Sequence, residues 1–267
     1  MHDMGAYLEV LGVRGRPDLG EMHRAHVHAI PFENLGPHQG HPVSLDVADL
    51  ERKIVSGRRG GYCFEQNLLF KAACEELGAG VDLHLARVRW RAPRGTIRPR
   101  GHLVLRVRAE GTSWLADVGF GSGTPLEPMP FGPGGPYTQS GWTYRVVEDD
   151  GELVLQRLDH GSWGDVYAFS PEPSPLVDIE MSNWYVSTHP NSPFVDGIIV
   201  GIRPRDGSVE LLSNWSGELT LVTETPVAST STPVDLSDAP EVLAQRFGIP
   251  GMVLGADGRL VSTLDTY

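Results

Sequence analysis

The stretch RRGGYCFEQN places Cys63, one of two cysteines in the chain, after a pair of glycines and at the head of an apolar run. A thiol is a strong nucleophile as its thiolate, and its pKa falls at a helix N-terminus or beside an imidazolium. If CFEQNLLFKAACEEL is a helix, the unpaired N–H groups of its first turn point toward Cys63. Gly60 and Gly61 supply unusual backbone angles and leave room for a substrate. The pattern predicts a nucleophilic cysteine, and a small buried apolar residue is the alternative.

A nucleophilic thiol also needs a base and a group that orients the base. Among the ten histidines, His102 opens the strand-like run HLVLRVR, and the following run SWLADVGF carries Asp117 among apolar residues. If residues 110–111 form a hairpin turn, Asp117 lies opposite Val104 and on the face that carries His102, one diagonal away. A carboxylate at that position reaches an imidazole. We therefore expect Cys63, His102 and Asp117 to act as nucleophile, base and orienting residue.

The first 80 residues must hold this cysteine, and their pattern is helical. Apolar residues recur at mixed three and four spacing in three segments before Cys63, and Ser44 or Asp46 can cap the third. The helix that begins at Cys63 has a natural stop at Gly78. The helices predicted before it cover residues 5–11, 19–29 and 47–55.

Alternation of apolar and polar residues begins after Gly80 and predicts a β-rich middle region. The Gly- and Pro-rich stretch TPLEPMPFGPGGPY predicts a loop within it. In the C-terminal third, strand-like runs precede one helix over residues 239–247, which Ser237 or Asp238 can cap. The expected fold class is therefore α+β. The predicted strands cover residues 81–90, 101–110, 112–120, 142–149, 152–158, 197–204, 208–213 and 218–224.

The composition excludes several classes of protein. A chain of 267 residues with 40% hydrophobic and 21% charged residues has the make-up of a globular protein with a substantial core. A formal net charge of −12 argues against general attraction to nucleic acid or to anionic membranes. No apolar run is long enough to cross a bilayer, and the N-terminus lacks a secretory signal. We therefore expect a cytoplasmic protein without nucleic-acid or membrane partners.

Disulfide and metal chemistry are not expected either. On one helix, Cys63 and Cys74 are separated by roughly 16 Å of rise, which is beyond disulfide reach. Two cysteines cannot build a four-cysteine zinc site, and His102 and Asp117 have no third ligand at metal spacing.

Several ordered motifs resemble the arylamine N-acetyltransferase family. RRGGYCFEQN, an isolated His102 and then WLADVGFG fall where that family has its Cys-His-Asp triad. The resemblance extends to PFENL near the N-terminus and to NWYVSTHPNSPFV later in the chain. It implies a core like that of cysteine proteases in three parts: a helical bundle over residues 1–80, a β-barrel region over 81–180 and an α/β lid over 181–267.

The resemblance also implies an activity. Cys63 would take an acyl group from a thioester, usually acetyl-CoA, and pass it by a ping-pong mechanism to an aromatic amine, hydrazine or hydroxylamine. A thiolate exchanges readily with a thioester, and His102 can manage the proton while Asp117 holds the imidazole tautomer. The positions that resemble substrate-binding residues are Phe120, Phe194 and Gly119. Those that resemble coenzyme-binding positions are Trp90, Gly101 and Gly121.

Gly101 departs from the family, in which threonine commonly precedes the histidine. Its missing hydroxyl and small size predict a wider floor beside the acyl donor. The segment before it is rich in arginine, which suits an acidic or phosphate-bearing donor, and a solvated loop is the alternative. The residues concerned are Arg91, Arg94, Arg98 and Arg100.

Three further hypotheses stay open on the sequence alone. Some related proteins are amide synthases, which release an aminoaryl polyketide from an acyl carrier protein as a macrolactam in ansamycin biosynthesis. The order Cys, His, Asp also suits a transglutaminase-like or protease-like hydrolase, which would turn over without an amine. A non-catalytic protein on this fold would have a Cys63 thiol no more reactive than that of Cys74. The expected partners are an aromatic amine and, under the amide synthase hypothesis, an acyl carrier protein.

Overall fold

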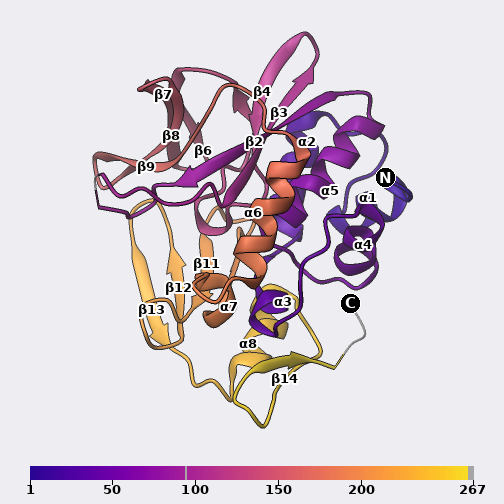
Figure 1. Cartoon of the computed structure of the whole chain (residues 1–267), viewed down its shortest axis with the longest axis vertical. Coiled ribbons are helices and arrows are strands. Elements are labelled where there is room, and N and C mark those ends of the chain that lie inside the picture. The colour runs from indigo at the N-terminus through magenta and orange to yellow at the C-terminus, as the bar shows by residue number, and fades with distance from the viewer. Residues whose placement is uncertain (94, 264–267) are drawn as a thin grey trace.

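The computed structural model describes residues 1–93 and 95–263, and the first part of the chain is helical. Asp3, Asp18 and Asp46 each cap a helix by accepting a backbone N–H two or three residues ahead. These helices gather on one side of the molecule (Figure 1). They are α1 (Met4–Leu11), α2 (Leu19–Ala29), α3 (Leu35–His38), α4 (Val47–Leu50), the π-helix η1 (Glu51–Ser56) and α5 (Cys63–Glu76).

The middle of the chain forms an antiparallel sheet of eight strands in the described residues, in the order β5-β4-β3-β2-β9-β8-β7-β6. Four of its hairpins turn at a residue followed by glycine, both with positive φ, at 110–111, 140–141, 150–151 and 160–161. This pair of left-handed residues matches the twist of antiparallel strands, which is why glycine is required second. The strands are β2 (Gly80–Val88), β3 (His102–Ala109), β4 (Thr112–Ala116), β5 (Met129–Pro130), β6 (Gly134–Gln139), β7 (Trp142–Asp149), β8 (Glu152–Asp159) and β9 (Ser162–Phe169).

A second antiparallel sheet, in the order β1-β10-β11-β12-β13, joins the N-terminal PFENL segment to the C-terminal third. Phe32 pairs with Gly201 and, by a parallel bridge, with Gly61, so this sheet edge reaches the loop before Cys63. Helix α8 (Ala239–Phe247) shares a hydrophobic core with the sheet. The strands are β1 (Phe32–Glu33), β10 (Ile199–Ile202), β11 (Val209–Ser213), β12 (Thr220–Glu224) and β13 (Ser229–Pro233), followed by the hairpin β14 (Met252–Leu254) and β15 (Leu260–Ser262).

Helix α6 (Leu176–Thr188) crosses the near face of the molecule from the large sheet toward α7 (Pro193–Asp196) and α3 (Figure 1). Ile179 and Val186 of α6 lie in the same hydrophobic core as Cys63, Phe64 and Leu103. The core beneath α6 therefore joins all three parts of the chain around the start of α5.

Most predicted elements are present, and the α+β class is confirmed. The helices at residues 5–11, 19–29, 63–78 and 239–247 differ from the observed ones by at most two residues at an end. The prediction of a loop over TPLEPMPFGPGGPY is wrong in part, because β5 and the first half of β6 lie within it. Strands β9 and β13 and helix α6 were not predicted, and α6 runs through the expected boundary between residues 180 and 181.

Candidate active site

The β3–β4 hairpin brings His102 and Asp117 together. Its turn has positive φ at Glu110 (53°) and Gly111 (74°), and the ladder runs from Ala109↔Thr112 to Leu105↔Ala116. One further step in this register sets Asp117 opposite Val104, as predicted. His102 Nε2 donates to Asp117 Oδ2 at 2.8 Å, with both side chains buried. The predicted imidazole–carboxylate contact is therefore present.

Cys63 is the first residue of α5, as predicted, and its Sγ lies 3.7 Å from the carbonyl oxygen of Gly101, the residue before His102. Cys63 also faces the His102 imidazole closely enough to contribute to raising its pKa. Because Asp117 engages Nε2, the ring nitrogen left for the thiol is Nδ1. The structure thus brings Cys63, His102 and Asp117 into one buried cluster.

The electrostatics of this cluster favour a protonated imidazole. Burial lowers the pKa of His102, but the Asp117 carboxylate and the Cys63 thiol outweigh it and raise that pKa to about 10. Burial works in the opposite direction on Asp117, and the His102 charge together with donors from Asn67 and Gly119 holds the pKa of this carboxyl below its usual value. An imidazolium beside a thiol at a helix N-terminus stabilises the thiolate.

A buried set of ion pairs supports the loop that precedes Cys63. Arg59 donates to Glu33 at 2.9 Å, and Lys53 donates to Glu65 at 2.7 Å. Glu65 also accepts the backbone N–H of Tyr62, which fixes the start of α5. A Cβ at Gly60 would lie 2.1 Å from the carbonyl oxygen of Pro31, so glycine is required there for close approach to PFENL. The glycine pair is therefore explained by packing as well as by room near the thiol.

Sequence reasoning missed two side chains behind the cluster, although one of them, Asn67, ends the RRGGYCFEQN stretch. Asn67 of α5 donates to Asp117 Oδ1 at 3.0 Å. His23 of α2 is fully buried and accepts the backbone N–H of Asp117 at 3.2 Å. The signals that could have found them are the asparagine four residues after Cys63 and a histidine on the buried face of an amphipathic helix.

The two predicted aromatic residues pack against different neighbours of the cluster. The Phe120 ring meets the His102 ring edge-on with centroids 5.0 Å apart. Phe194 packs against Tyr62, the neighbour of Cys63, with centroids 5.7 Å apart. Both phenylalanines are half-buried. Their role in substrate binding stays a prediction.

The predicted glycines have different surroundings. A Cβ at Gly119 would lie 2.8 Å from Cys63 Cα, so this residue allows β4 and α5 to approach each other. A Cβ at Gly101 would lie 3.2 Å from Val186 of α6. Val186 therefore lies close to Gly101 on the α6 side, and the wider floor expected beside the acyl donor stays a prediction. Trp90 stacks on the buried guanidinium of Arg157 at 4.3 Å, which gives it a packing role.

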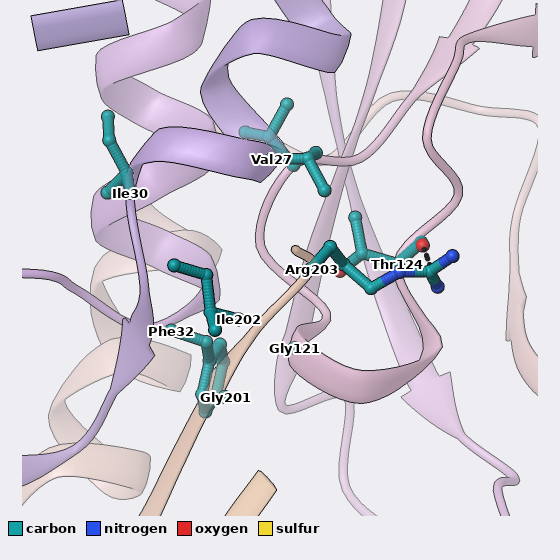
Figure 2. A pocket seen from close by; sticks show the side chains of 9 residues that line it. Val27, Ile30, Phe32, Gly121, Thr124, Gly201, Ile202 and Arg203 are labelled. Carbon is teal, nitrogen blue, oxygen red and sulfur yellow. Dashed lines mark hydrogen bonds between the residues drawn. The ribbon is translucent and has the colours of Figure 1, made fainter. Parts of the chain in front are cut away.

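Gly121 has a positive φ of 78° and lies against the Phe32 ring. It lines a cavity of about 10 Å³ between α2, β10 and η2 (Gly121–Gly123), shown in Figure 2. Arg203, whose guanidinium donates to the carbonyl oxygen of Thr124, forms one wall. This volume suits a single water and is far too small for a coenzyme. The coenzyme-binding roles of Gly121, Gly101 and Trp90 stay predictions.

The arginine-rich segment before Gly101 is exposed where it is described. Arg91, Arg98 and Arg100 are exposed, and Arg100 lies 3.6 Å from Glu152. Arg94 lies outside the described residues. Ser182 of α6 donates to the carbonyl oxygen of Arg100 at 2.6 Å, so the end of this segment is anchored next to the site.

Within the part of the chain that the structure describes, no group of three or more His, Cys, Asp or Glu side chains is placed to hold a metal ion. Over the same residues, no helix has the length and apolar character needed to span a membrane.

Known proteins are similar to this chain in sequence and in fold. The N-acetyltransferase family model matches residues 17–252. An arylamine N-acetyltransferase of Mycolicibacterium smegmatis is 40% identical over 218 residues, which is 78% of this chain and 79% of that protein. A Salmonella typhimurium arylamine N-acetyltransferase / N-hydroxyarylamine O-acetyltransferase is 34% identical over 209 residues, 78% of this chain and 74% of that protein. The structure of Mycobacterium marinum arylamine N-acetyltransferase in complex with CoA aligns with a TM-score of 0.87 and 34% identity, over 92% of this chain and 93% of that one.

Proposed function

The chain belongs to the arylamine N-acetyltransferase family, and from this premise we propose that it transfers an acetyl group from acetyl-CoA, through a Cys63 thioester, to an aromatic amine, a hydrazine or an N-hydroxyarylamine. The observation that carries the proposal is the 2.8 Å bond between His102 and Asp117 beside Cys63 at the start of α5. CoA in the Mycobacterium marinum relative supports the donor, and the name of the Salmonella relative supports the hydroxylamine acceptors.

In the first half-reaction the Cys63 thiolate attacks the thioester carbonyl carbon of acetyl-CoA. A bond from Sγ to the acetyl carbon forms, and the bond from that carbon to the coenzyme sulfur breaks. The coenzyme thiolate leaves with the proton that His102 supplies from Nδ1, since Nε2 is engaged with Asp117. The products are acetyl-Cys63, a neutral imidazole and CoA.

In the second half-reaction the amine nitrogen attacks the acetyl carbon of acetyl-Cys63. The neutral His102 takes the proton that the amine loses, and the Cys63 thiolate is the leaving group. The cluster thereby returns to its starting charges. Asp117 keeps Nδ1 aimed at the reacting atoms and stabilises the imidazolium, without taking up the proton itself. Phe120 and Phe194, which lie near the thiol, would form apolar walls for an aromatic acceptor.

Neither alternative enzyme has matching support. The relatives described above are named as acetyltransferases. A hydrolase would use the same cluster but would discharge the thioester to water.

The test is the intact mass of the protein after mixing with acetyl-CoA in the absence of amine. We expect one added acetyl group on the wild type and on Cys74→Ala, none on Cys63→Ala, and release of the group when an arylamine is added. Release of free acetate without amine would establish a hydrolase instead. Absence of any adduct, with Cys63 still open to selective alkylation, would overturn acetyl-CoA as donor.

A further inference from the structure

We propose that Asn67 is a positioning residue for the cluster of Cys63, His102 and Asp117. The predicted effect on acetyl transfer rests on the proposed function. Asn67 lies four residues after Cys63 on α5, so the two side chains share one face of the helix, one turn apart. Helix α5 would thereby supply both the nucleophile, Cys63, and the side chain that holds His102 and Asp117 in position.

The side chain of Asn67 forms hydrogen bonds with residues on both sides of the β3–β4 hairpin. Its Nδ2 donates to Asp117 Oδ1 at 3.0 Å and to the carbonyl oxygen of Leu103 at 2.8 Å. Its Oδ1 accepts the backbone N–H of Val118 at 3.1 Å. Leu103 follows His102 and Val118 follows Asp117 in the chain. One buried amide therefore holds the backbone next to the base, the backbone next to the orienting residue, and the carboxylate itself.

The Asn67 contact also decides which carboxylate oxygen faces the imidazole. Asp117 Oδ1 accepts from Asn67 and from the backbone N–H of Gly119, both at 3.0 Å, which leaves Oδ2 for His102. A Cβ at Gly119 would lie 2.9 Å from Asn67 Nδ2. Glycine at this position therefore permits the close approach that the Asn67 contact requires.

The titratable neighbours of Asp117 differ in their charge and in the part of Asp117 that they face, and the Tyr167 hydroxyl is among those that face its side chain. The titratable groups that face Asp117 are His102, His23 and Tyr167. Burial lowers the pKa of His23 to about 4, so this ring is neutral at pH 7, and it binds the backbone of Asp117. Burial raises the pKa of Tyr167 well above its usual value, so it adds no charge.

The experiment measures alkylation of Cys63 by iodoacetamide against pH in the wild type, Asn67→Ala and Asn67→Asp. Loss of a hydrogen bond to a charged group weakens the hold on Asp117 and so on the His102 imidazolium. The rate of Cys63 alkylation at neutral pH should therefore fall about tenfold in Asn67→Ala relative to wild type. In acetyl transfer, kcat should fall at least about tenfold, with little change in KM for the amine.

Asn67→Asp keeps the size of the side chain and carries the test if Asn67→Ala does not fold. A protonated Asp at this position can still donate to Asp117, whereas the ionised form repels it. The deficit relative to wild type should therefore grow as the pH rises through the titration of the new carboxyl.

Asn34→Ala is the matched control. Asn34 is also fully buried, and its side chain likewise makes three bonds to backbone groups, those of Phe194, Gly197 and Ile199, away from the cluster. It should lose as much thermal stability as Asn67→Ala without shifting the alkylation profile. A profile in Asn67→Ala that coincides with wild type, at equal loss of stability, would overturn the positioning role. A shifted profile in a protein that never accepts acetyl from acetyl-CoA would keep that role and reject the proposed function.

Discussion

The two ends of α5 each carry a buried cysteine, and their surroundings differ. Cys63 is 3% exposed and Cys74 is 1% exposed, so burial alone does not separate the two thiols. Cys63 begins the helix beside His102, where the free N–H groups and an imidazolium favour a thiolate. Cys74 lies in the last turn, near the negative end of the helix dipole, and burial together with Glu75 raises the pKa of its thiol well above the usual value. Position along the helix and the neighbouring charges, more than exposure, distinguish a candidate nucleophile from a core residue.

Of the substitutions that test this comparison, Asp117→Asn should lower the rate of acetyl transfer at Cys63 the most. The variant keeps the shape of the side chain, but it removes the charge that supports the His102 imidazolium and favours the wrong tautomer. We expect kcat for acetyl transfer to fall by about 10³- to 10⁴-fold with the fold intact. Steady-state kinetics with circular dichroism as the check on folding would measure this. A rate near that of wild type would show that the carboxylate does not orient the base.

The second-largest expected effect is a difference between Cys63 and Cys74 in their rate of alkylation by iodoacetamide. The pKa of His102 is raised to about 10, so the imidazolium is present at neutral pH and is lost only as the pH rises through that value. Alkylation of Cys63 should therefore vary little between about pH 6 and 8 and exceed that of Cys74 at least about a hundredfold. Peptide mapping of the labelled protein separates the two sites. Equal labelling of both cysteines in the folded protein would remove the distinction and favour a non-catalytic fold.

Replacing Cys74 with alanine should have the smallest effect. Removing the sulfur leaves a small cavity in the shared core of α5, which we expect to cost about 1 kcal/mol of unfolding free energy. The rate of acetyl transfer should stay at the wild-type level, because no step uses this thiol. Thermal unfolding and turnover on the same sample test both statements. A large fall in turnover at unchanged stability would mean that Cys74 takes part in the reaction.

Local patterns were enough to predict much of the fold and of the cluster. The apolar run after Cys63, the alternation in β3 and β4 and the glycine at 111 all report interactions between near neighbours in the chain. Helix α6 was missed because its outer face is also apolar: Leu176, Val177, Met181 and Trp184 are exposed, so the run lacks an amphipathic pattern. Asn67 and His23 were missed because their positions on the buried faces of helices do not reveal their bonding partner, Asp117, which is distant in the chain.

Caps, turn glycines and alternation act over a few residues, so the start of a helix at Cys63 and the shared hairpin of His102 and Asp117 follow from local sequence. Only the tertiary structure decided that the hairpin packs against that helix, with Asn67 bonded to Asp117 and Gly119 against Cys63. It also placed α6 beside Gly101, with the Val186 side chain 3.2 Å from where a Cβ of residue 101 would lie. These contacts join residues 50 to 85 positions apart, and they depend on shape and hydrogen bonding in a packed core, which no local pattern encodes.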